Sequence, residues 1–299
     1  MSLSRGAGLE AEQDDTLSIG TRHLLVIGID AYTNGIPRLN NAVRDAKRFV
    51  EAMTHYGFTP EYSTLLLDEQ ATRRAILQAF DDLRQKLGPE DELLLYFSGH
   101  GLYDDATRTG YWIPADGVEG DRSTFLPNEE VLKLIRNARA RHILGIVDSC
   151  FSASLFVQRS LSLSETTRRL YSIPSRWLMT SGRLEPVSDG SLGEHSPFAA
   201  SLLTHLENNR KQALGIAELW LQMREGVISN AKQTPRCEPL QNAHHMGGEF
   251  FFLQQGAAPP PEIVRAPEGA PTLVLTDKHG NETLMRLDEL EKKGYRRQA

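Results

Sequence analysis

Two stretches, LLLYFSGHGLYD at residues 93–104 and ILGIVDSCFSAS at residues 143–154, decide the fold class of this 299-residue chain. Each is an apolar run that stops in small residues, and each stop presents one reactive side chain, His100 in the first and Cys150 in the second. Continuous apolar runs are typical of strands buried on both faces of a parallel sheet. Because the carboxyl ends of such strands meet at one edge, we expect His100 and Cys150 to be neighbours.

The sequence from about residue 23 to about residue 253 alternates apolar runs with helical periodicity. This order predicts an α/β fold with a mostly parallel central sheet and helices on both faces. Strands are expected at residues 23–30, 63–68, 91–99, 110–115, 141–148, 176–182 and 248–253. Helices are expected at residues 40–56, 72–87, 129–138, 197–208 and 215–231.

Four segments interrupt or flank this alternation. Residues 1–20 read as a disordered leader, and residues 156–175, rich in Ser, Thr and Arg, as a mobile surface loop. Residues 256–272 form a Pro- and Ala-rich linker, and residues 273–299 a short tail whose charged LDELEKKGYRR is typical of a solvated helix.

Composition excludes several classes of protein. The formal net charge of −6 provides no basic field for nucleic acid or anionic lipid, and no apolar run approaches the roughly 18 to 20 residues that span a bilayer. The N-terminus lacks an apolar signal core. Two cysteines, Cys150 and Cys237, are too few for a disulfide framework. We therefore expect a cytoplasmic protein that keeps a free thiol, without nucleic-acid or membrane partners.

The two reactive side chains suit nucleophilic catalysis. A cysteine thiolate is a strong nucleophile, and a nearby imidazole raises the thiolate fraction or protonates a departing amine. The glycines beside His100 allow a sharp turn and a close approach to a substrate backbone. The backbone N–H groups of Gly101 and Cys150 are candidates for an oxyanion hole.

The motifs YFSGHG and DSCFSAS resemble the two signatures of caspase-like cysteine peptidases (peptidase C14), in their metacaspase and bacterial orthocaspase branch. The resemblance covers roughly residues 22–253 and includes LNNAVRDAKRFVEAM and the SRWLMTSGRLEPVSDG and HSPFAASLL segments. It implies a caspase-like three-layer sandwich with His100 and Cys150 as the catalytic dyad. It also implies a peptidase domain at residues 21–255, with a large-subunit part at 21–155, a junction loop at 156–175 and a small-subunit part at 176–255.

The resemblance also implies a specificity site and a processing site. Asp148, Asp45 and Ser98 match positions that bind the P1 side chain, and two partly desolvated carboxylates need a cationic partner, so we predict cleavage after Arg or Lys. The junction loop contains the candidate autoprocessing sites Arg159, Arg168 and Arg169, which would make the chain a zymogen.

The chemistry requires no cofactor, and no metal ligand set is predicted. Calcium as an activator stays open, because the acidic residues that could bind it are scattered. These are Asp104, Asp105, Asp116, Glu119 and Asp121. The expected partners are protein substrates and, by family analogy alone, an upstream activator in a bacterial stress, cell-death or defence pathway.

Other interpretations compete with this one. The chain could be a catalytically silent caspase-fold scaffold, or a different thiol enzyme such as an acyl transferase. Cys150 could be a small buried hydrophobe, and His100 a structural loop histidine. Asp148 could cap a following helix, and Asp45, between Arg44 and Lys47 in its helix, could lie on a solvated face. Cys237 reads as an inert loop thiol.

Overall fold

The computed structural model describes residues 19–149, 167–182, 189–191, 193–230, 233–240, 242–255, 272–276 and 282–286. Within these ranges the α-helices are α1 (Ala42–Thr54), α2 (Arg73–Lys86), α3 (Asn128–Asn137), α4 (Thr167–Ser172), α5 (Pro197–Glu207) and α6 (Ile216–Asn230). The strands are β1 (Arg22–Gly28), β2 (Ser63–Leu67), β3 (Glu92–Ser98), β4 (Gly101–Asp104), β5 (Thr109–Trp112), β6 (Leu126–Pro127), β7 (His142–Asp148), β8 (Ser175–Thr180), β9 (Ala213–Gly215), β10 (Arg236–Pro239), β11 (Phe251–Leu253), β12 (Thr272–Thr276) and β13 (Glu282–Arg286).

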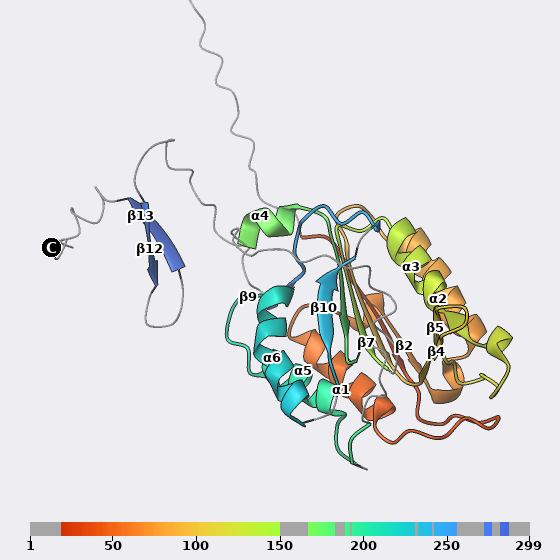
Figure 1. Ribbon diagram of the computed structural model, residues 1–299. Coiled ribbons are helices and arrows are strands. Elements are labelled where there is room, and N and C mark those ends of the chain that lie inside the picture. The colour runs from red at the N-terminus through yellow and green to blue at the C-terminus, as the bar shows by residue number, and fades with distance from the viewer. Residues whose placement is uncertain are drawn as a thin grey trace, which may run out of the picture. The chain divides into compact units, whose positions relative to one another are not determined.

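The central sheet has six strands in the order β10-β8-β7-β3-β1-β2. All neighbouring pairs are parallel except β10 with β8, at one edge. Helices α1, α5 and α6 cover one face and α2 and α3 cover the other (Figure 1). The predicted three-layer α/β fold with a mostly parallel sheet is confirmed.

The apolar runs form strands because both of their faces are covered. Along β1, Leu25 and Ile27 pack in a cluster with residues of α2 and α3, whereas Leu24 and Val26 pack in a second cluster with residues of α1, α5 and α6. All four side chains are at most 1% exposed. With side chains buried on alternating sides, the sequence reads as one unbroken hydrophobic stretch.

Two expectations about the last strands are wrong. The sixth strand of the sheet is β10, in a region read as a loop, so Cys237 lies in an edge strand and not in a loop. The run at residues 248–253 forms a strand only at Phe251–Leu253, and this strand, β11, pairs with β9 in a separate two-stranded sheet. β10 carries Arg, Glu and Pro in four residues, a composition that strands tolerate mainly at sheet edges.

The predicted loop at residues 156–175 is also partly wrong, because α4 lies within it. Tyr171 anchors this helix: its side chain is 1% exposed and its hydroxyl donates to Glu92 at 2.5 Å. His142 binds the Tyr171 carbonyl through Nε2 at 2.7 Å and Ser175 Oγ through Nδ1 at 2.8 Å. Tertiary contacts at the amino-terminal end of the sheet thus stabilise a helix that has no strong sequence period. Residues 156–166 lie outside the described residues.

Two further features complete the described chain. β4, β5 and β6 form a three-stranded antiparallel sheet, which contains the predicted strand near residue 110. Pro261–Ala299 form a separate unit in which β12 pairs with β13 in a hairpin. The tail helix expected at LDELEKKGYRR lies outside the described residues. Among the residues described, we find no helix with the length and apolar character needed to cross a membrane.

Candidate active site

The strand register brings the two sequence motifs together. Ser98 at the end of β3 pairs with Asp148 at the end of β7, and Gly99 donates its N–H to the Asp148 carbonyl at 3.3 Å. His100 follows Ser98 by two positions, and Cys150 follows Asp148 by two positions. Residues that follow a pair on adjacent parallel strands by the same number of positions are expected to lie close together. Cys150 itself lies outside the described residues.

The His100 ring is held by a backbone carbonyl. Nε2 lies 2.9 Å from the oxygen of Pro37, and because a carbonyl only accepts, Nε2 carries the proton. In the neutral ring, Nδ1 is then the basic nitrogen. Burial lowers the pKa of His100, which favours this neutral form near pH 7.

Tyr32 holds the backbone of the same residue. Its hydroxyl accepts from the His100 N–H at 2.8 Å and donates to the Ile113 carbonyl at 3.0 Å, and its ring centroid lies 4.8 Å from that of His100. Gly99 is required beside it, since a Cβ there would lie 2.6 Å from the Tyr32 hydroxyl oxygen. The position of His100 is therefore set from two sides, by Pro37 on the ring and by Tyr32 on the backbone.

We predict that Tyr32→Phe lowers kcat about tenfold with little change in KM, because the His100 N–H and the Ile113 carbonyl each lose a buried partner. Steady-state kinetics on a peptide substrate measures both constants. Tyr56→Phe is the matched control: the buried Tyr56 hydroxyl donates to Leu206 O at 2.7 Å and accepts from Asn209 at 3.2 Å, outside the active site. Equal kcat losses in both variants would show that Tyr32 acts only through stability.

Gly101 begins β4, and its N–H is oriented by the pairing with β5. Ile113 donates to the His100 carbonyl at 3.0 Å, so the next pair, Gly101 with Trp112, does not exchange ladder hydrogen bonds. The Gly101 N–H consequently points away from β5 and is able to serve a ligand. The second oxyanion candidate, the N–H of Cys150, lies outside the described residues.

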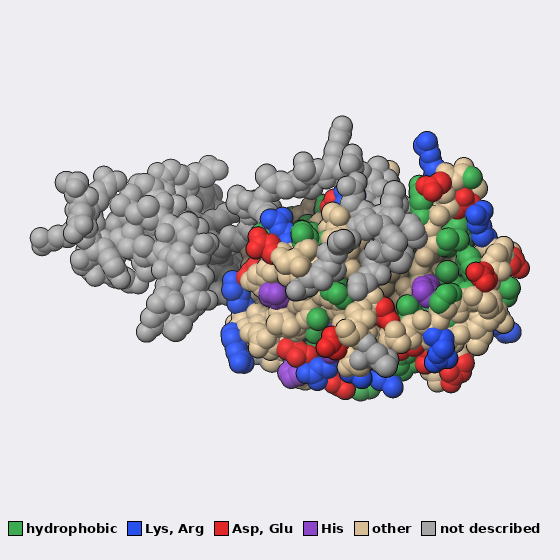
Figure 2. Space-filling model, turned by 60° about the horizontal axis from the view of Figure 1, so that its bottom comes forward, with side chains coloured by type: hydrophobic (Ala, Val, Ile, Leu, Met, Phe, Trp, Pro, Cys, Tyr) green, Lys and Arg blue, Asp and Glu red, His purple; other side chains and the backbone are tan. Residues whose placement is uncertain are grey.

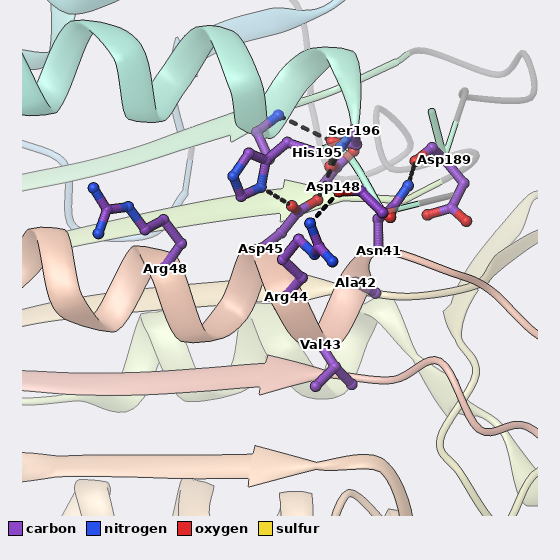
Figure 3. Close-up of polar contacts among 12 residues, drawn as sticks. Asn41, Ala42, Val43, Arg44, Asp45, Arg48, Asp148, Asp189, His195 and Ser196 are labelled. Carbon is purple, nitrogen blue, oxygen red and sulfur yellow. Dashed lines mark hydrogen bonds and ion pairs between the residues drawn. The ribbon is translucent and has the colours of Figure 1, made fainter. Parts of the chain in front are cut away.

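Asp45 and Asp148, here called the carboxylate pair, lie side by side under the start of α5 (Figure 3). Asp45 is 0% exposed and Asp148 5% exposed, so the solvated-face interpretation of Asp45 is wrong. Ser196 bridges them: its N–H donates to Asp45 Oδ2 at 3.1 Å and its hydroxyl donates to Asp148 Oδ2 at 2.5 Å. His195 Nδ1 lies 2.5 Å from Asp45 Oδ1. Ser98, paired with Asp148, is 4% exposed.

Burial raises the pKa of both members of the carboxylate pair, to about 6 for Asp45 and to about 7 for Asp148. The contacts to His195 and Ser196 oppose this rise for Asp45, and the Ser196 and Ser181 hydroxyls oppose it for Asp148. The negative charge of Asp189 adds to the rise in both cases. A cationic ligand would stabilise the ionised forms of both carboxylates, and its attraction to them would strengthen its binding.

The raised pKa of Asp148 predicts a pH-dependent stability. Between about pH 4 and pH 7 the folded chain keeps a proton on Asp148 that the unfolded chain has released, so this group lowers the free energy of unfolding by about 1.4 kcal/mol per pH unit. Its stabilising contribution is complete below the ordinary pKa of 3.8 and is lost as the pH rises through about 7. The Asp148→Asn variant has no ionisable group at this position. Its free energy of unfolding, measured in urea, should therefore fall less steeply than that of the wild type from about pH 5 to pH 7. Parallel slopes would contradict the shift.

Sequence reasoning missed four side chains of this site: His195, Ser196, Asp189 and Tyr32. Ser196 had a detectable signal, since Ser followed by Pro is typical of a helix N-cap, and Ser196 Oγ does accept from Ala199 N at 2.9 Å. The other three stand in loops whose position only the tertiary structure gives. Asp189 joins the segment before α1 to the segment before α5, because its carboxylate accepts from Asn40 N at 2.7 Å.

Asp30, after β1, has a structural role. Its carboxylate accepts from the N–H groups of Ala42 and Val43 at 2.8 and 3.2 Å and so caps α1, the helix that carries Asp45. Asp68 in turn accepts from the N–H of Asp30 at 2.9 Å. These contacts fix the first turn of α1 against the carboxyl end of the sheet.

The remaining predicted residues are scattered. Asp104 pairs with Arg122 at 2.5 Å, Asp116 accepts from Arg73 N at 2.8 Å, and no three acidic, His or Cys side chains in the described ranges form a metal-binding group. Arg159 lies outside the described residues, as does the Arg168 side chain, whereas Arg169 is exposed on α4. On the face in Figure 2, acidic, basic and histidine side chains are interspersed.

Comparisons with known proteins agree with this geometry. A family model described as the caspase domain (Peptidase_C14) matches residues 21–245. The chain belongs to this family. The caspase-domain chain is 25% identical over 177 residues to Metacaspase-1 of Eremothecium gossypii, covering 53% of the chain and 37% of that protein. It is 28% identical over 169 residues to Metacaspase-4 of Arabidopsis thaliana, covering 50% of the chain and 38% of that protein.

A third relative is bacterial. A protein named "Probable protease" from a Desulfuromonadales bacterium is 27% identical over 163 residues, covering 47% of the caspase-domain chain and 20% of that protein. The chain thus spans between a fifth and two fifths of the length of these relatives. A crystal structure of a Geobacter sulfurreducens protein shares the fold, with a TM-score of 0.54, 18% identity and coverage of 74% of this chain and 94% of that one. The predicted membership of the caspase-like cysteine peptidases (peptidase C14) is confirmed.

Proposed function

We propose that this caspase domain is a cysteine endopeptidase that cleaves protein substrates after arginine or lysine. The observation that carries the activity is the oriented imidazole of His100: Pro37 fixes its tautomer at the end of β3, and the paired strand β7 leads directly to Cys150. Membership of the Peptidase_C14 family supports the same assignment.

The reaction follows from these groups. His100 takes the proton of the Cys150 thiol, and the resulting thiolate attacks the scissile carbonyl. The oxyanion that forms is held by the N–H groups of Gly101 and Cys150. His100 then protonates the leaving amine, so that the C–N bond breaks and a thioester remains. Water, deprotonated by His100, hydrolyses the thioester and releases the free carboxylate product. The residues named supply nucleophile, acid and base without a metal ion.

The carboxylate pair supports the P1 assignment. The two carboxylates, bridged by Ser196 and raised in pKa, complement the positive charge and the fork geometry of a guanidinium group. Because neither carboxylate is more than 5% exposed, the site has to open before a P1 side chain enters. This supports an activation step, for which calcium or an upstream protein stays a proposal.

Fluorogenic peptides that differ only in P1 test the function. Arginine and lysine substrates are expected to be cleaved at least tenfold faster than the isosteric but neutral citrulline substrate, and an aspartate substrate is expected to be inert. Cys150→Ala supplies the background rate. Preferential cleavage of the aspartate or citrulline peptide would refute the P1 assignment, and activity unchanged by Cys150→Ala would refute the cysteine mechanism.

Autoprocessing is expected at Arg159 and not at Arg168 or Arg169. The last two belong to α4, whose backbone is held by helical hydrogen bonds and by the buried Tyr171, so it is not available as an extended substrate. Intact-mass analysis of active protein should show fragments ending at Arg159, absent from Cys150→Ala. Fragments ending at Arg168 or Arg169 would mean that α4 unwinds during processing.

A further inference from the structure

The His195 imidazole differs in accessibility from the carboxylate that it contacts. The histidine side chain is 33% exposed, whereas the Asp45 side chain is 0% exposed, and the two meet at 2.5 Å between Nδ1 and Oδ1 (Figure 3). His195 therefore lies between Asp45 and solvent. Asp45 matches a P1-binding position, so a basic side chain that enters from solvent meets His195 first.

Ser196, which contacts both members of the carboxylate pair, is fixed in place. Ser196 Oγ accepts from Ala199 N at 2.9 Å and its carbonyl accepts from Ala200 N at 2.8 Å, so it forms the N-cap of α5. Pro197 occupies the first position of that helix. Displacing Ser196 would unwind the first turn of α5. His195 precedes the helix, so its side chain can rotate away while Ser196 keeps both carboxylates in place.

The acidic groups around His195 give the site a negative charge. The charge of Asp189 raises the pKa of Asp45, and the charge of Asp45 raises the pKa of Asp148. On β3, the phenol of Tyr96 is buried, and this burial, followed by the charges of Asp45 and Asp148, raises its pKa. Tyr96 is therefore neutral and does not compensate the carboxylates.

The nearest arginines of α1 are turned to other partners. Arg44 donates to the Gly193 carbonyl, and Arg48 forms ion pairs with Glu51 and Glu207, both at 2.8 Å. Among the described residues that hydrogen-bond to the Asp45 carboxylate, His195 is the one whose side chain can carry a positive charge. Its imidazole is the internal group that resembles a basic P1 side chain.

We propose that His195 is a specificity-determining residue of this peptidase, an internal occupant of the P1 site that an arginine or lysine side chain must displace from Asp45 to bind. The proposal rests on the proposed cleavage after basic residues and adds the group that competes for the same carboxylate. A neutral P1 side chain gains nothing from displacing His195. His195 would thus set how strongly the enzyme prefers a cation over a neutral isostere.

The test compares kcat/KM for arginine and citrulline P1 peptides in wild type, His195→Ala and His195→Lys at about pH 8.5, where both members of the carboxylate pair are ionised. His195→Ala should raise the arginine-to-citrulline ratio about three- to tenfold, as expected for the loss of one competing hydrogen bond. His195→Lys should lower the ratio by a similar factor, since lysine supplies a permanent cation. His205→Ala, on α5 with its ring on Ser201 O at 2.8 Å, is the matched control and should leave the ratio unchanged.

Each result separates the two proposals. A wild type that shows no preference for arginine over citrulline refutes the basic P1 specificity, and with it the role of His195. A wild type that prefers arginine, with a ratio that is unchanged or lower in His195→Ala, overturns the role of His195 alone. Rates that fall equally for both substrates in His195→Ala and His195→Lys indicate a structural role and also overturn the proposal. Thermal melting of each variant confirms that it is folded.

Discussion

Replacing His100 with alanine is expected to lower kcat by about 10²- to 10⁴-fold, because His100 is the general acid and base of the proposed mechanism. KM should change little, since the carboxylate pair and Ser196 remain in place. The measurement is steady-state cleavage of an arginine P1 peptide, with Cys150→Ala defining the background. His100 is not part of either large hydrophobic cluster, so the melting temperature should be close to that of the wild type.

The matched control is His55→Ala. His55 is an exposed histidine at the carboxyl end of α1, the end opposite the carboxylate pair, and its substitution should leave kcat unchanged. If His100→Ala retained kcat within a few-fold of the wild type, His100 would be a structural loop histidine, and the assignment of the dyad would fail.

Replacing Asp148 with asparagine is the second change with a large expected effect. Asparagine has nearly the same shape and can still accept the Ser196 hydroxyl, but it removes one of the two charges that would face a P1 guanidinium. We expect kcat/KM for an arginine substrate to fall by about 10²- to 10³-fold, the usual cost of removing one member of a buried charge pair. Cleavage of the citrulline substrate should change much less.

The control for this change is Glu92→Gln. Glu92 is a 1% exposed carboxylate at the amino-terminal end of β3, paired with Arg22 and Tyr171. It therefore matches Asp148 in burial but lies at the other end of the sheet, and its substitution should affect stability without affecting P1 preference. If Asp148→Asn weakened cleavage of both substrates equally, Asp148 would support the fold of the site and not its specificity.

The sequence motifs predicted the sheet and the dyad edge because those features depend on local patterns. Apolar runs such as Leu93–Phe97 follow from burial on both faces, and strand order follows from the parallel connections. β10 could not be predicted, because four residues containing Arg, Glu and Pro carry no strand signal of their own. α4 could not be predicted either, since the buried Tyr171 and not its periodicity stabilises it.

The candidate site likewise contains residues that the motifs predicted and residues that they did not. Side chains in motifs, such as His100 and Asp148, were predicted from their position after apolar runs. The groups that orient or occupy the site were not: Pro37 acts through its carbonyl, which every residue has, and Tyr32 reaches His100 from a loop after another strand. His195 meets Asp45 from a distant part of the chain, a contact that no local pattern encodes.

The parallel pairing of β7 with β8 spans the junction, with the register running from His142 opposite Ser175 to Val147 opposite Thr180. A nick between the two strands would therefore break covalent continuity without separating the two polypeptides, which stay joined within one continuous sheet. A nicked sample should elute from a sizing column like the intact chain and resolve into two bands only under denaturing conditions. Its unfolding would become dissociative, so that its melting temperature would rise with protein concentration, unlike that of the uncut chain.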